Sequence, residues 1–111
     1  PLHSFYMAKT ITENNVIQEL KKIGVDKRAV DYMYKKSVFR ILKLENISTP
    51  TANIIKQEML SIGGEVAVNK GCINCSVQNT DILIMGTMKQ IDDLKEKLQW
   101  QGGECKKVLE E

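Results

Sequence analysis

The sequence predicts an α/β domain of the α+β kind, a two-layer sandwich in which helices pack on a ferredoxin-like sheet. Between residues 38 and 98 the patterns run strand, helix, strand, strand, helix, which is the order of such a sandwich. Hydrophobic residues make up 42% of the chain and charged residues 27%, as is usual for a folded globular protein. The 111 residues suit one domain with a single modest core.

Two short helices are predicted near the amino terminus, after a weak strand at residues 5–10. The first helix begins after Thr12 and ends at Gly24, and Asp26 caps the second. Each helix carries apolar residues on one face: Val16, Leu20 and Ile23 in the first, and Val30, Met33 and Tyr34 in the second. We therefore expect both helices to pack onto the sandwich.

A strand followed closely by a helix forms the predicted centre of the chain. Residues 38–44 are rich in β-branched, aromatic and long apolar residues and stop at Glu45 and Asn46, as a strand would. Thr49 is the expected helix cap, Pro50 the first helical residue, and Gly63 the left-handed stop. Helical spacing predicts one core-facing stripe, made of Ala52, Ile55, Met59 and Ile62.

The second half predicts three short strands and a further helix. Residues 65–68 form the first strand, and residues 72–77 and 80–85 form a hairpin. Thr87 and Gln90 make a capping box that opens a helix, which ends at the pair Gly102 and Gly103. Residues 104–111 fit the period of a helix slightly better than that of an edge strand.

Several motifs occur in a specific order along the chain. They are I-G-V-D at 23–26, K-L-E at 43–45, A-N-I-I-K-Q-E-M-L at 52–60, G-G-E-V-A-V at 63–68 and N-T-D-I-L-I-M-G-T at 79–87. With these motifs the chain resembles the amino-terminal accessory domain that precedes the catalytic barrel in a subset of bacterial dihydropteroate synthases. The resemblance covers about residues 16–98.

The resemblance implies a domain organisation and a role in folate biosynthesis. Residues 1–111 would be a single accessory domain, with residues 12–36 as a helical lead-in, 37–100 as the α/β core, and 101–111 as the start of a linker to the catalytic domain. We interpret residues 1–6 as derived in part from an expression tag. The parent enzyme, a transferase, would condense hydroxymethyl-dihydropterin diphosphate with 4-aminobenzoate, assisted by magnesium.

A catalytic barrel of the (β/α)₈ type needs roughly 200 residues or more, so it does not fit in this chain. We therefore expect no catalytic, cofactor-binding or metal-binding residue here. The expected partner is the catalytic barrel of the same polypeptide, and a homodimer is also allowed for. The alternative from another class is a free-standing regulatory module that binds a small ligand at a sheet edge or a symmetric interface.

Cys72 and Cys75 have the C-x-x-C spacing of a metal or redox pair. A structural zinc site needs about four ligands, and the only further candidates are Cys105 and His3, which lies in the segment attributed to a tag. In a strand an offset of three also points the two side chains to opposite faces. We therefore favour small buried cysteines. With His3 as the one histidine, a nucleophile and base pair is also disfavoured.

The predicted central helix has a polar face made of Asn53, Lys56 and Gln57. Asn53 and Gln57 are four residues apart, so they lie together, and Lys56 adds a cation beside them. A solvated helix face is the ordinary interpretation of such a group. Because the face falls inside one of the quoted motifs, we name it as the candidate contact surface for a neighbouring domain or partner.

Charge and aromatic content disfavour a nucleic-acid partner. The net charge is +2, the sequence pI is about 8.6 and aromatic residues make up 5% of the chain, so the excess of positive charge is small and stacking platforms are few. A weak RNA-binding domain remains the third alternative. The sequence has no apolar run of about 18 residues and no secretion signal, so we expect no membrane contact and a cytoplasmic location.

Overall fold

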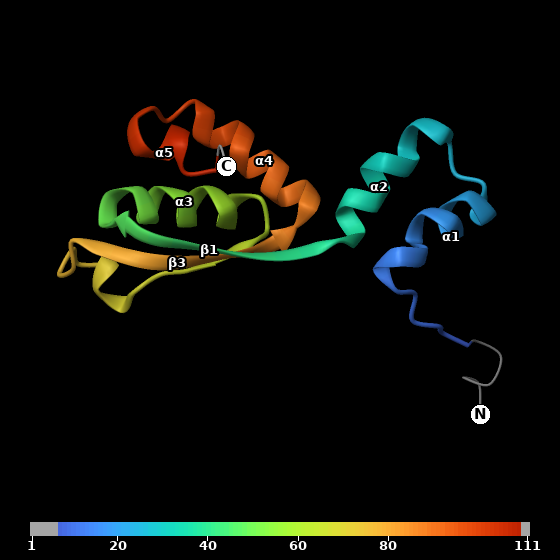
Figure 1. Ribbon diagram of the computed structural model, residues 1–111, viewed down its shortest axis with the longest axis horizontal. Helices are drawn as coiled ribbons and strands as arrows, with labels where there is room; N and C mark the ends of the chain where they lie inside the picture. Colours follow the sequence, from blue (N-terminus) through green and yellow to red (C-terminus); the bar gives the residue numbers. More distant parts are fainter. Residues whose placement is uncertain (1–6, 110–111) are drawn as a thin grey trace.

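The computed structural model describes residues 7–109 and divides them into a helical arm and a sandwich body (Figure 1). The arm holds α1 (Val16–Ile23) and α2 (Val30–Ser37), each led by a 3₁₀ turn, η2 (Glu13–Asn15) and η3 (Lys27–Ala29). The body holds β1 (Phe39–Ser48), α3 (Thr49–Ser61), β2 (Glu65–Ala67), the 3₁₀ turn η4 (Lys70–Cys72), β3 (Asn79–Thr87), α4 (Met88–Gln99) and α5 (Gly103–Lys107). The mixture of helices and sheet confirms the predicted α+β class.

The described residues form one three-stranded antiparallel sheet with the order β1-β3-β2. Lys43 of β1 and Ala67 of β2 both lie opposite Leu83 of β3, so the central strand is β3. The chain order strand, helix, strand, strand, helix together with this strand order is that of the first three strands of a ferredoxin-like sheet. The outer edge of β1 has no strand partner within residues 7–109.

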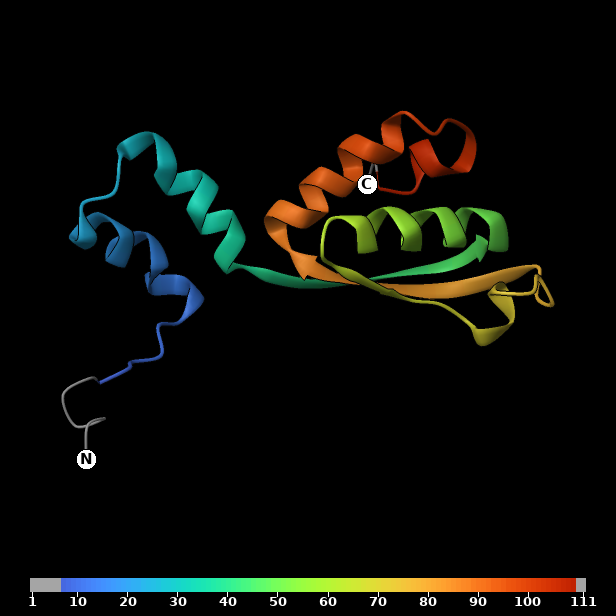
Figure 2. The same ribbon diagram turned by 180° about the vertical axis from the view of Figure 1, so that it is seen from behind.

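Helices α3 and α4 cover one face of the sheet and form the core with it (Figures 1 and 2). The predicted stripe of α3 is confirmed at Ala52, Ile55 and Met59, which are fully buried, whereas Ile62 is half-buried at the end of the helix. The facing core residues are Ile47, Val66, Ile82, Ile84, Ile91, Leu94 and Leu98. The alternation of buried and exposed residues along β3 is the signature of a sheet covered on one side.

The strand predicted at residues 38–44 is longer than the sequence indicated. It continues to Ser48 through an irregularity between Leu44 and Ile47, where Asn46 takes a positive φ of 54°. The backbone N–H of Asn46 donates to the carboxylate of Asp81, with N···Oδ1 at 3.0 Å. Glu45 and Asn46, which were predicted to end the strand, therefore form a β-bulge within it.

Thr49 is not the cap of α3, which corrects the sequence prediction. Ser48 occupies the cap position without a side-chain hydrogen bond, and the Thr49 hydroxyl donates to the Val77 carbonyl oxygen at 2.6 Å. The buried hydroxyl is therefore used to tie α3 to the segment before β3. Pro50 does lie in the first turn, and Gly63 has a φ of +91°, as expected of a left-handed stop.

The hairpin strand predicted at residues 72–77 is also wrong. Residues Lys70–Cys72 form a 3₁₀ turn, residues 73–78 form turns and bends, and the strand begins at Asn79. Asn69 starts this irregular segment, because its side-chain oxygen accepts from the Gly71 N–H at 2.7 Å. Local side-chain hydrogen bonds of this kind compete with a strand ladder.

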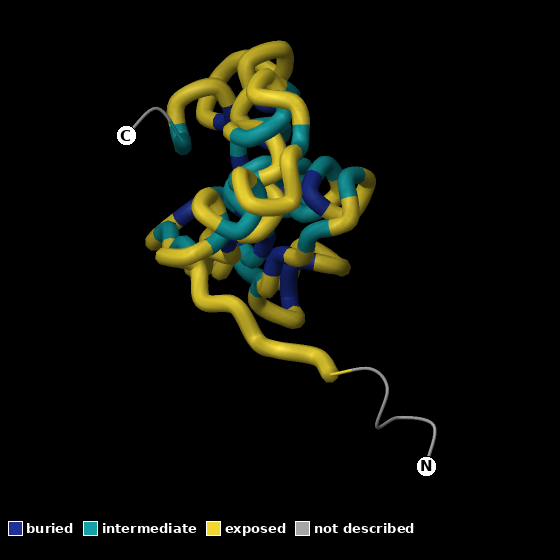
Figure 3. Tube along the Cα trace, turned by 90° about the vertical axis from the view of Figure 1, so that its right-hand side faces the viewer, coloured by how far each residue is buried: buried dark blue, intermediate teal, exposed yellow. Residues whose placement is uncertain are grey.

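Of the two amino-terminal helices, α2 lies against α4 and the end of β3, whereas α1 packs on α2, so the predicted packing on the sandwich is confirmed for α2 alone. Neither α1 nor α2 contains a buried residue, and both lie beyond the end of the sheet in Figures 1 and 2. The radius of gyration is 18.0 Å, whereas a compact chain of this length has about 13 Å. Figure 3 shows that the stretch at the amino-terminal end of the described chain is exposed.

The residues that end α1 and cap the next helical turn nevertheless agree with the sequence prediction. Gly24 ends α1 with a φ of +87°, and the Asp26 carboxylate accepts from the Arg28 N–H at 2.8 Å. Residues 7–12 have no regular structure, so the strand predicted at 5–10 is wrong there, and its first two residues lie outside the described chain.

The arm contacts the body where α2 lies against α4 and the end of β3, and the joint contains one buried residue and several exposed ion pairs. Val38 is fully buried, and its carbonyl oxygen accepts from the Met88 N–H at 2.7 Å. Lys35 of α2 lies 3.2 Å from the Asp92 carboxylate of α4, and Arg40 lies 3.2 Å from Glu13. The hydrogen bond to Asp92 raises the pKa of Lys35. Because exposed ion pairs contribute little, these contacts hold the arm weakly.

The carboxyl-terminal elements confirm their predicted signals. Thr87 and Gln90 form the capping box of α4 in both directions. Residues 104–107 are helical, and α5 places Cys105 in the core with only 4% of its surface exposed. The packed body therefore extends at least to α5. No helix within residues 7–109 is long and apolar enough to cross a membrane.

Candidate docking surfaces

The residues predicted to make a contact face, Asn53, Lys56 and Gln57, do not form one free surface. The Asn53 amide donates to the Cys72 carbonyl oxygen at 3.0 Å. Lys56 donates from Nζ to the Val66 carbonyl oxygen at 2.6 Å and to the Glu65 carboxylate at 3.1 Å. Gln57 is exposed. Asn53 and Lys56 thus fasten α3 to η4 and β2, and Gln57 is the member of the face that points to solvent.

The Glu65 carboxylate is shared between the β2 backbone and α3. It accepts from the Val66 N–H at 2.8 Å and from Lys56, and these two bonds hold the pKa of Glu65 below its usual value. The polar flank of α3 is therefore an internal joint at this point. Nothing in the helical spacing of residues 52–60 reveals it, because β2 and η4 reach this flank only in the folded chain.

Cys72 and Cys75 are separated by the turn that contains them. Cys72 is fully buried, with its sulfur 3.8 Å from the Thr49 hydroxyl oxygen, as the small-cysteine interpretation requires. Cys75 is exposed and takes a positive φ of 56°, so that interpretation is wrong for this residue. In the described part of the chain, no three His, Cys, Asp or Glu residues group as a metal site would need.

The face of the sheet opposite α3 and α4 carries apolar side chains. Residues directly opposite each other in a sheet share a face, so the register places five apolar residues together here: Phe39, Ile41, Ala67, Leu83 and Met85. We call this set the open-face patch. Phe39 is 53% exposed and Ile41 is 64% exposed. An exposed antiparallel face is ordinarily polar, so a patch of this kind indicates a contact surface.

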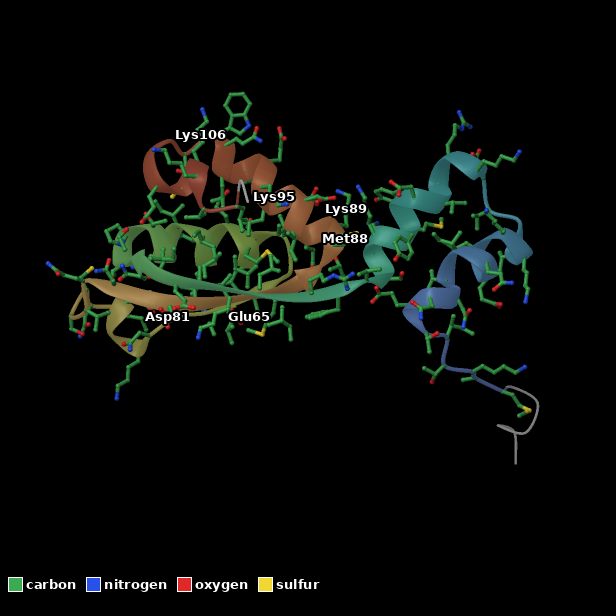
Figure 4. All side chains as sticks on the ribbon, in the orientation of Figure 1. Glu65, Asp81, Met88, Lys89, Lys95 and Lys106 are labelled. Atoms are coloured by element: carbon green, nitrogen blue, oxygen red, sulfur yellow. The ribbon has the colours of Figure 1, made fainter. Side chains whose placement is uncertain are left out.

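Acidic side chains border the open-face patch. Figure 4 shows Glu65 and Asp81 on the side of the sheet away from α3 and α4. Glu45 is exposed beside the bulge of β1. Within residues 7–109 neither Glu45 nor Asp81 forms an ion pair. Asp81 already accepts from the Asn46 N–H, and the exposed Lys43 lies on the same face opposite Leu83, so this face carries charges of both signs.

A second apolar surface lies in the arm, in a groove of about 820 Å³ between α1 and α2. We call it the arm groove. Its lining combines the apolar residues Ile17, Val25 and Val30 with Gly24 and with the charged residues Lys21, Lys27 and Asp31. Among the described residues Lys21 and Lys27 form no ion pair. Residues 7–37 contain seven basic and four acidic side chains, so the arm is cationic.

A polar hollow of about 390 Å³ lies at the other end of the sheet, lined by Asn46, Asn69, Asn79, Thr80 and Asp81. Its backbone donors are already engaged. The N–H of Asn46 donates to Asp81, and the N–H of Asn69 donates to the Thr80 hydroxyl at 3.0 Å. The donors that the hollow offers to a small ligand are therefore the side-chain amides of Asn46, Asn69 and Asn79.

The chain was compared with known proteins, and one relative has a sequence similar to nearly all of it. That relative is the bifunctional dihydropteroate synthase/dihydropteroate reductase of Helicobacter pylori. The two sequences are 28% identical over 105 residues. The alignment covers 95% of this chain and 28% of the relative, so the chain spans less than a third of the relative's length.

No family model matches the chain, and no solved structure matches it. The similarity to the Helicobacter pylori protein extends over the arm and the body alike, because 105 of the 111 residues are aligned. The chain is therefore similar to one part of a longer polypeptide, the bifunctional Helicobacter pylori protein.

Proposed function

We propose that this chain is a non-catalytic accessory domain of a dihydropteroate synthase polypeptide and acts in folate biosynthesis through that polypeptide. The observation that carries the proposal is the alignment, which takes in 95% of this chain but 28% of the relative. A chain that matches so small a share leaves most of the relative's length for a catalytic barrel.

The lack of grouped catalytic chemistry in the described residues supports the non-catalytic part of the proposal. The acidic side chains of the body are exposed or serve structural bonds, as Glu65 does with Lys56 and Glu104 with Ser48. General acid–base or nucleophilic catalysis needs such groups to converge on one substrate atom. The barrel of the same polypeptide would hold the substrates and the magnesium ion.

The proposed partner of the accessory domain is that barrel, and the proposed contact is the polar flank of α3 at Gln57. Asn53 and Lys56 would support this contact from behind, because their side chains already fix α3 against η4 and β2. The exposed Gln57 amide suits a domain contact, since it both donates and accepts hydrogen bonds and lies on a helix that η4 and β2 hold in place.

The name of the Helicobacter pylori relative also includes a reductase activity. Reduction of a pterin by hydride transfer needs a bound cofactor that carries the hydride. Gly63 and Gly64 follow α3, and Gly102 and Gly103 open the five-residue α5, but neither pair has the glycine spacing of a phosphate-binding loop. We therefore place the reductase chemistry outside this chain as well.

The proposal is tested with the purified chain and with the full-length polypeptide that carries it. The chain alone is assayed for dihydropteroate formation and for dihydropteroate reduction, and we expect neither. In the full-length polypeptide, Gln57→Ala should weaken the association of the domain with the barrel, whereas Gln99→Ala on α4 is the matched exposed control. Turnover of either reaction by the chain alone would overturn the proposal.

A second candidate function is the free-standing regulatory module that binds a small polar ligand. The polar hollow at Asn46 and Asp81 is the observation that favours it. The two candidates differ in the natural polypeptide, because a module ends near residue 111 and an accessory domain continues into a barrel. Reading the coding sequence beyond that codon separates them.

A further inference from the structure

The two edges of the sheet differ in how their outward backbone groups are used. At the β2 edge, side chains occupy both groups of Val66, because its carbonyl oxygen accepts from Lys56 at 2.6 Å and its N–H donates to the Glu65 carboxylate at 2.8 Å. A further strand could pair there only by breaking these bonds, so the β2 edge is closed at Val66. At the β1 edge no strand partner is present within residues 7–109.

The register shows which backbone groups of β1 point away from the sheet. Val66 bonds to side chains outside the sheet, so it forms a non-hydrogen-bonded pair with Ile84 of β3. The N–H and C=O of Ile84 therefore point the other way, toward Leu42 of β1. Successive residues of a strand alternate in this respect, so the N–H and C=O groups of Ile41 and Lys43 point to the free edge.

A separate contact agrees with this alternation. The carbonyl oxygen of Val38, just before β1, accepts from the N–H of Met88, just after β3, at 2.7 Å. Even-numbered residues before the bulge of β1 thus bond toward β3, and odd-numbered residues bond outward. Within residues 7–109 no other strand reaches the outward groups of Ile41 and Lys43.

A groove of about 390 Å³ lies beside the free edge of β1, and the end of the described chain forms part of it. We call it the edge groove. Its lining joins residues 41–44 of β1 to Lys95 of α4 and to Val108 and Leu109. Val108 and Leu109 are half-buried against the core, so the chain is held at this edge where its description ends.

The chain enters the edge groove in the direction opposite to β1. Glu104 of α5 bonds to Ser48 at the carboxyl end of β1, because its carboxylate accepts from the Ser48 hydroxyl at 2.6 Å. Figure 1 shows α5 at that same end of the body. Val108 and Leu109 then line the groove with residues 41–44. Between residues 104 and 109 the chain thus passes back along β1, as an antiparallel strand does.

We propose that the free edge of β1 receives a fourth strand, formed by the segment of the same polypeptide that follows residue 109 and antiparallel to β1. The proposal rests on the proposed function, in which the polypeptide continues beyond this chain. The fourth strand bonds to the N–H and C=O groups of Ile41 and Lys43. Its alternate side chains cover Leu42 and Leu44, which face the core and are only half-buried.

A strand in this position determines how the accessory domain is joined to the rest of the polypeptide. A flexible linker leaves two domains free to reorient, whereas a strand within the sheet fixes the point at which the polypeptide leaves the domain. The fourth strand is therefore a rigid joint between the accessory domain and the catalytic barrel.

The proposal is tested by amide hydrogen exchange, resolved to single residues, on the full-length polypeptide and on this chain alone. The amides of Ile41 and Lys43 should exchange about tenfold more slowly in the full-length polypeptide, because there they donate to the fourth strand. The amides of Leu42 and Leu44 are the matched control, since they point to β3 and should be protected in both proteins. Equal exchange of Ile41 and Lys43 in the two proteins would overturn the proposal.

A proline variant gives a second measurement. Lys43→Pro removes one outward N–H, and proline is tolerated in an edge strand whose N–H faces solvent. The variant should therefore destabilise the body more in the full-length polypeptide than in this chain alone, as measured by exchange of the α3 amides. Leu42→Pro removes an N–H that points to β3 and should destabilise both proteins alike. A Lys43→Pro effect of the same size in both proteins would contradict the fourth strand.

The same experiments separate the fourth strand from the proposed function. A polypeptide with a barrel and a freely exchanging β1 edge would overturn the fourth strand and leave the proposed function standing. A polypeptide that continues into another kind of domain, with Ile41 and Lys43 protected, would do the reverse. A natural polypeptide that ends at residue 111 would contradict both. If protection of Ile41 and Lys43 in this chain alone rises with protein concentration, the edge pairs with a second copy and the proposal is wrong.

Discussion

Ile55 lies at the centre of the core, where α3 meets the sheet, and none of its surface is exposed. Ile55→Ala removes buried apolar volume that the neighbouring side chains cannot refill. We expect a loss of about 2 to 5 kcal/mol of unfolding free energy, a large part of the stability of a domain of this size. Urea denaturation measures the loss.

The matched control for Ile55 is Gln57, which belongs to the same helix and is exposed. Gln57→Ala should change the unfolding free energy by less than about 0.5 kcal/mol. Equal losses for the two variants would show that the core is not organised as described.

Glu104 gives the chain a pH-dependent contribution to stability. Its carboxylate accepts from the Ser48 hydroxyl, with the oxygens 2.6 Å apart, and this bond holds the pKa of Glu104 below its usual value of 4.5. A pKa that is lower in the folded state stabilises the fold above the unfolded pKa, and the benefit is lost as the pH falls through the folded pKa.

The prediction concerns the difference in stability between the wild type and Glu104→Gln. The wild type should be the more stable protein at pH near 7, and the difference should shrink as the pH falls below 4.5. Urea denaturation at a series of pH values measures it. A difference that grows in acid would show that the Ser48 bond does not favour the ionised carboxylate.

At the scale of elements, substitution of Lys56 tests whether its side chain holds α3 and β2 together or only belongs to an exposed surface. Its ammonium group donates to the Val66 carbonyl oxygen at 2.6 Å and so holds β2 against α3. Lys56→Ala should therefore lower the stability of the domain by about 1 kcal/mol, more than Gln57→Ala does. If the two variants are equally stable by denaturation, the bond to Val66 contributes nothing in solution.

The sequence predicted the elements whose signals are local. The capping box of Thr87 and Gln90, the left-handed Gly63 and the buried stripe of α3 all depend on residues within one helix, and all agree with the structure. The roles of Asn46, Thr49 and Asn53 were not predictable in the same way. Each of them bonds to a segment that is at least 19 residues away, so only the folded chain brings the partners together.

The hairpin predicted at residues 72–85 is wrong in its first strand, also because of bonds that the strand pattern does not reveal. Residues 72–77 have the apolar and β-branched content of a strand, but Asn69 and the buried Cys72 turn the backbone into η4. Only the Gln57 part of the candidate contact face remains exposed, because Asn53 bonds to η4 and Lys56 bonds to β2. Helical spacing identifies the face of a helix and says nothing about which loop folds against it.

At the scale of the whole molecule, the apolar stripes of α1 and α2 predicted burial but did not specify the partner surface. An amphipathic helix packs equally well on its own body, on a second helix or on another copy. In this chain α1 packs on α2, and α2 also lies against α4 and the end of β3. The helical period of the apolar residues therefore does not predict that α1 lies apart from the body.

The exposure of the arm leads to a prediction about local stability. Backbone amides in α1 and α2 should exchange with deuterium faster than those in α3 and α4, because no buried residue protects the arm helices. Hydrogen–deuterium exchange on dilute protein measures the difference. Protection of α1 as strong as that of α4 under these conditions would contradict the account of a weakly held arm.

The central proposal is that this sequence is one part of a dihydropteroate synthase polypeptide. The most direct measurement is the mass and the tryptic peptides of the natural polypeptide, isolated with an antibody against this chain. The account predicts a polypeptide much heavier than 12.6 kDa whose other peptides form a (β/α)₈ barrel sequence. A natural polypeptide of about 12.6 kDa, with no peptides beyond this sequence, would contradict it.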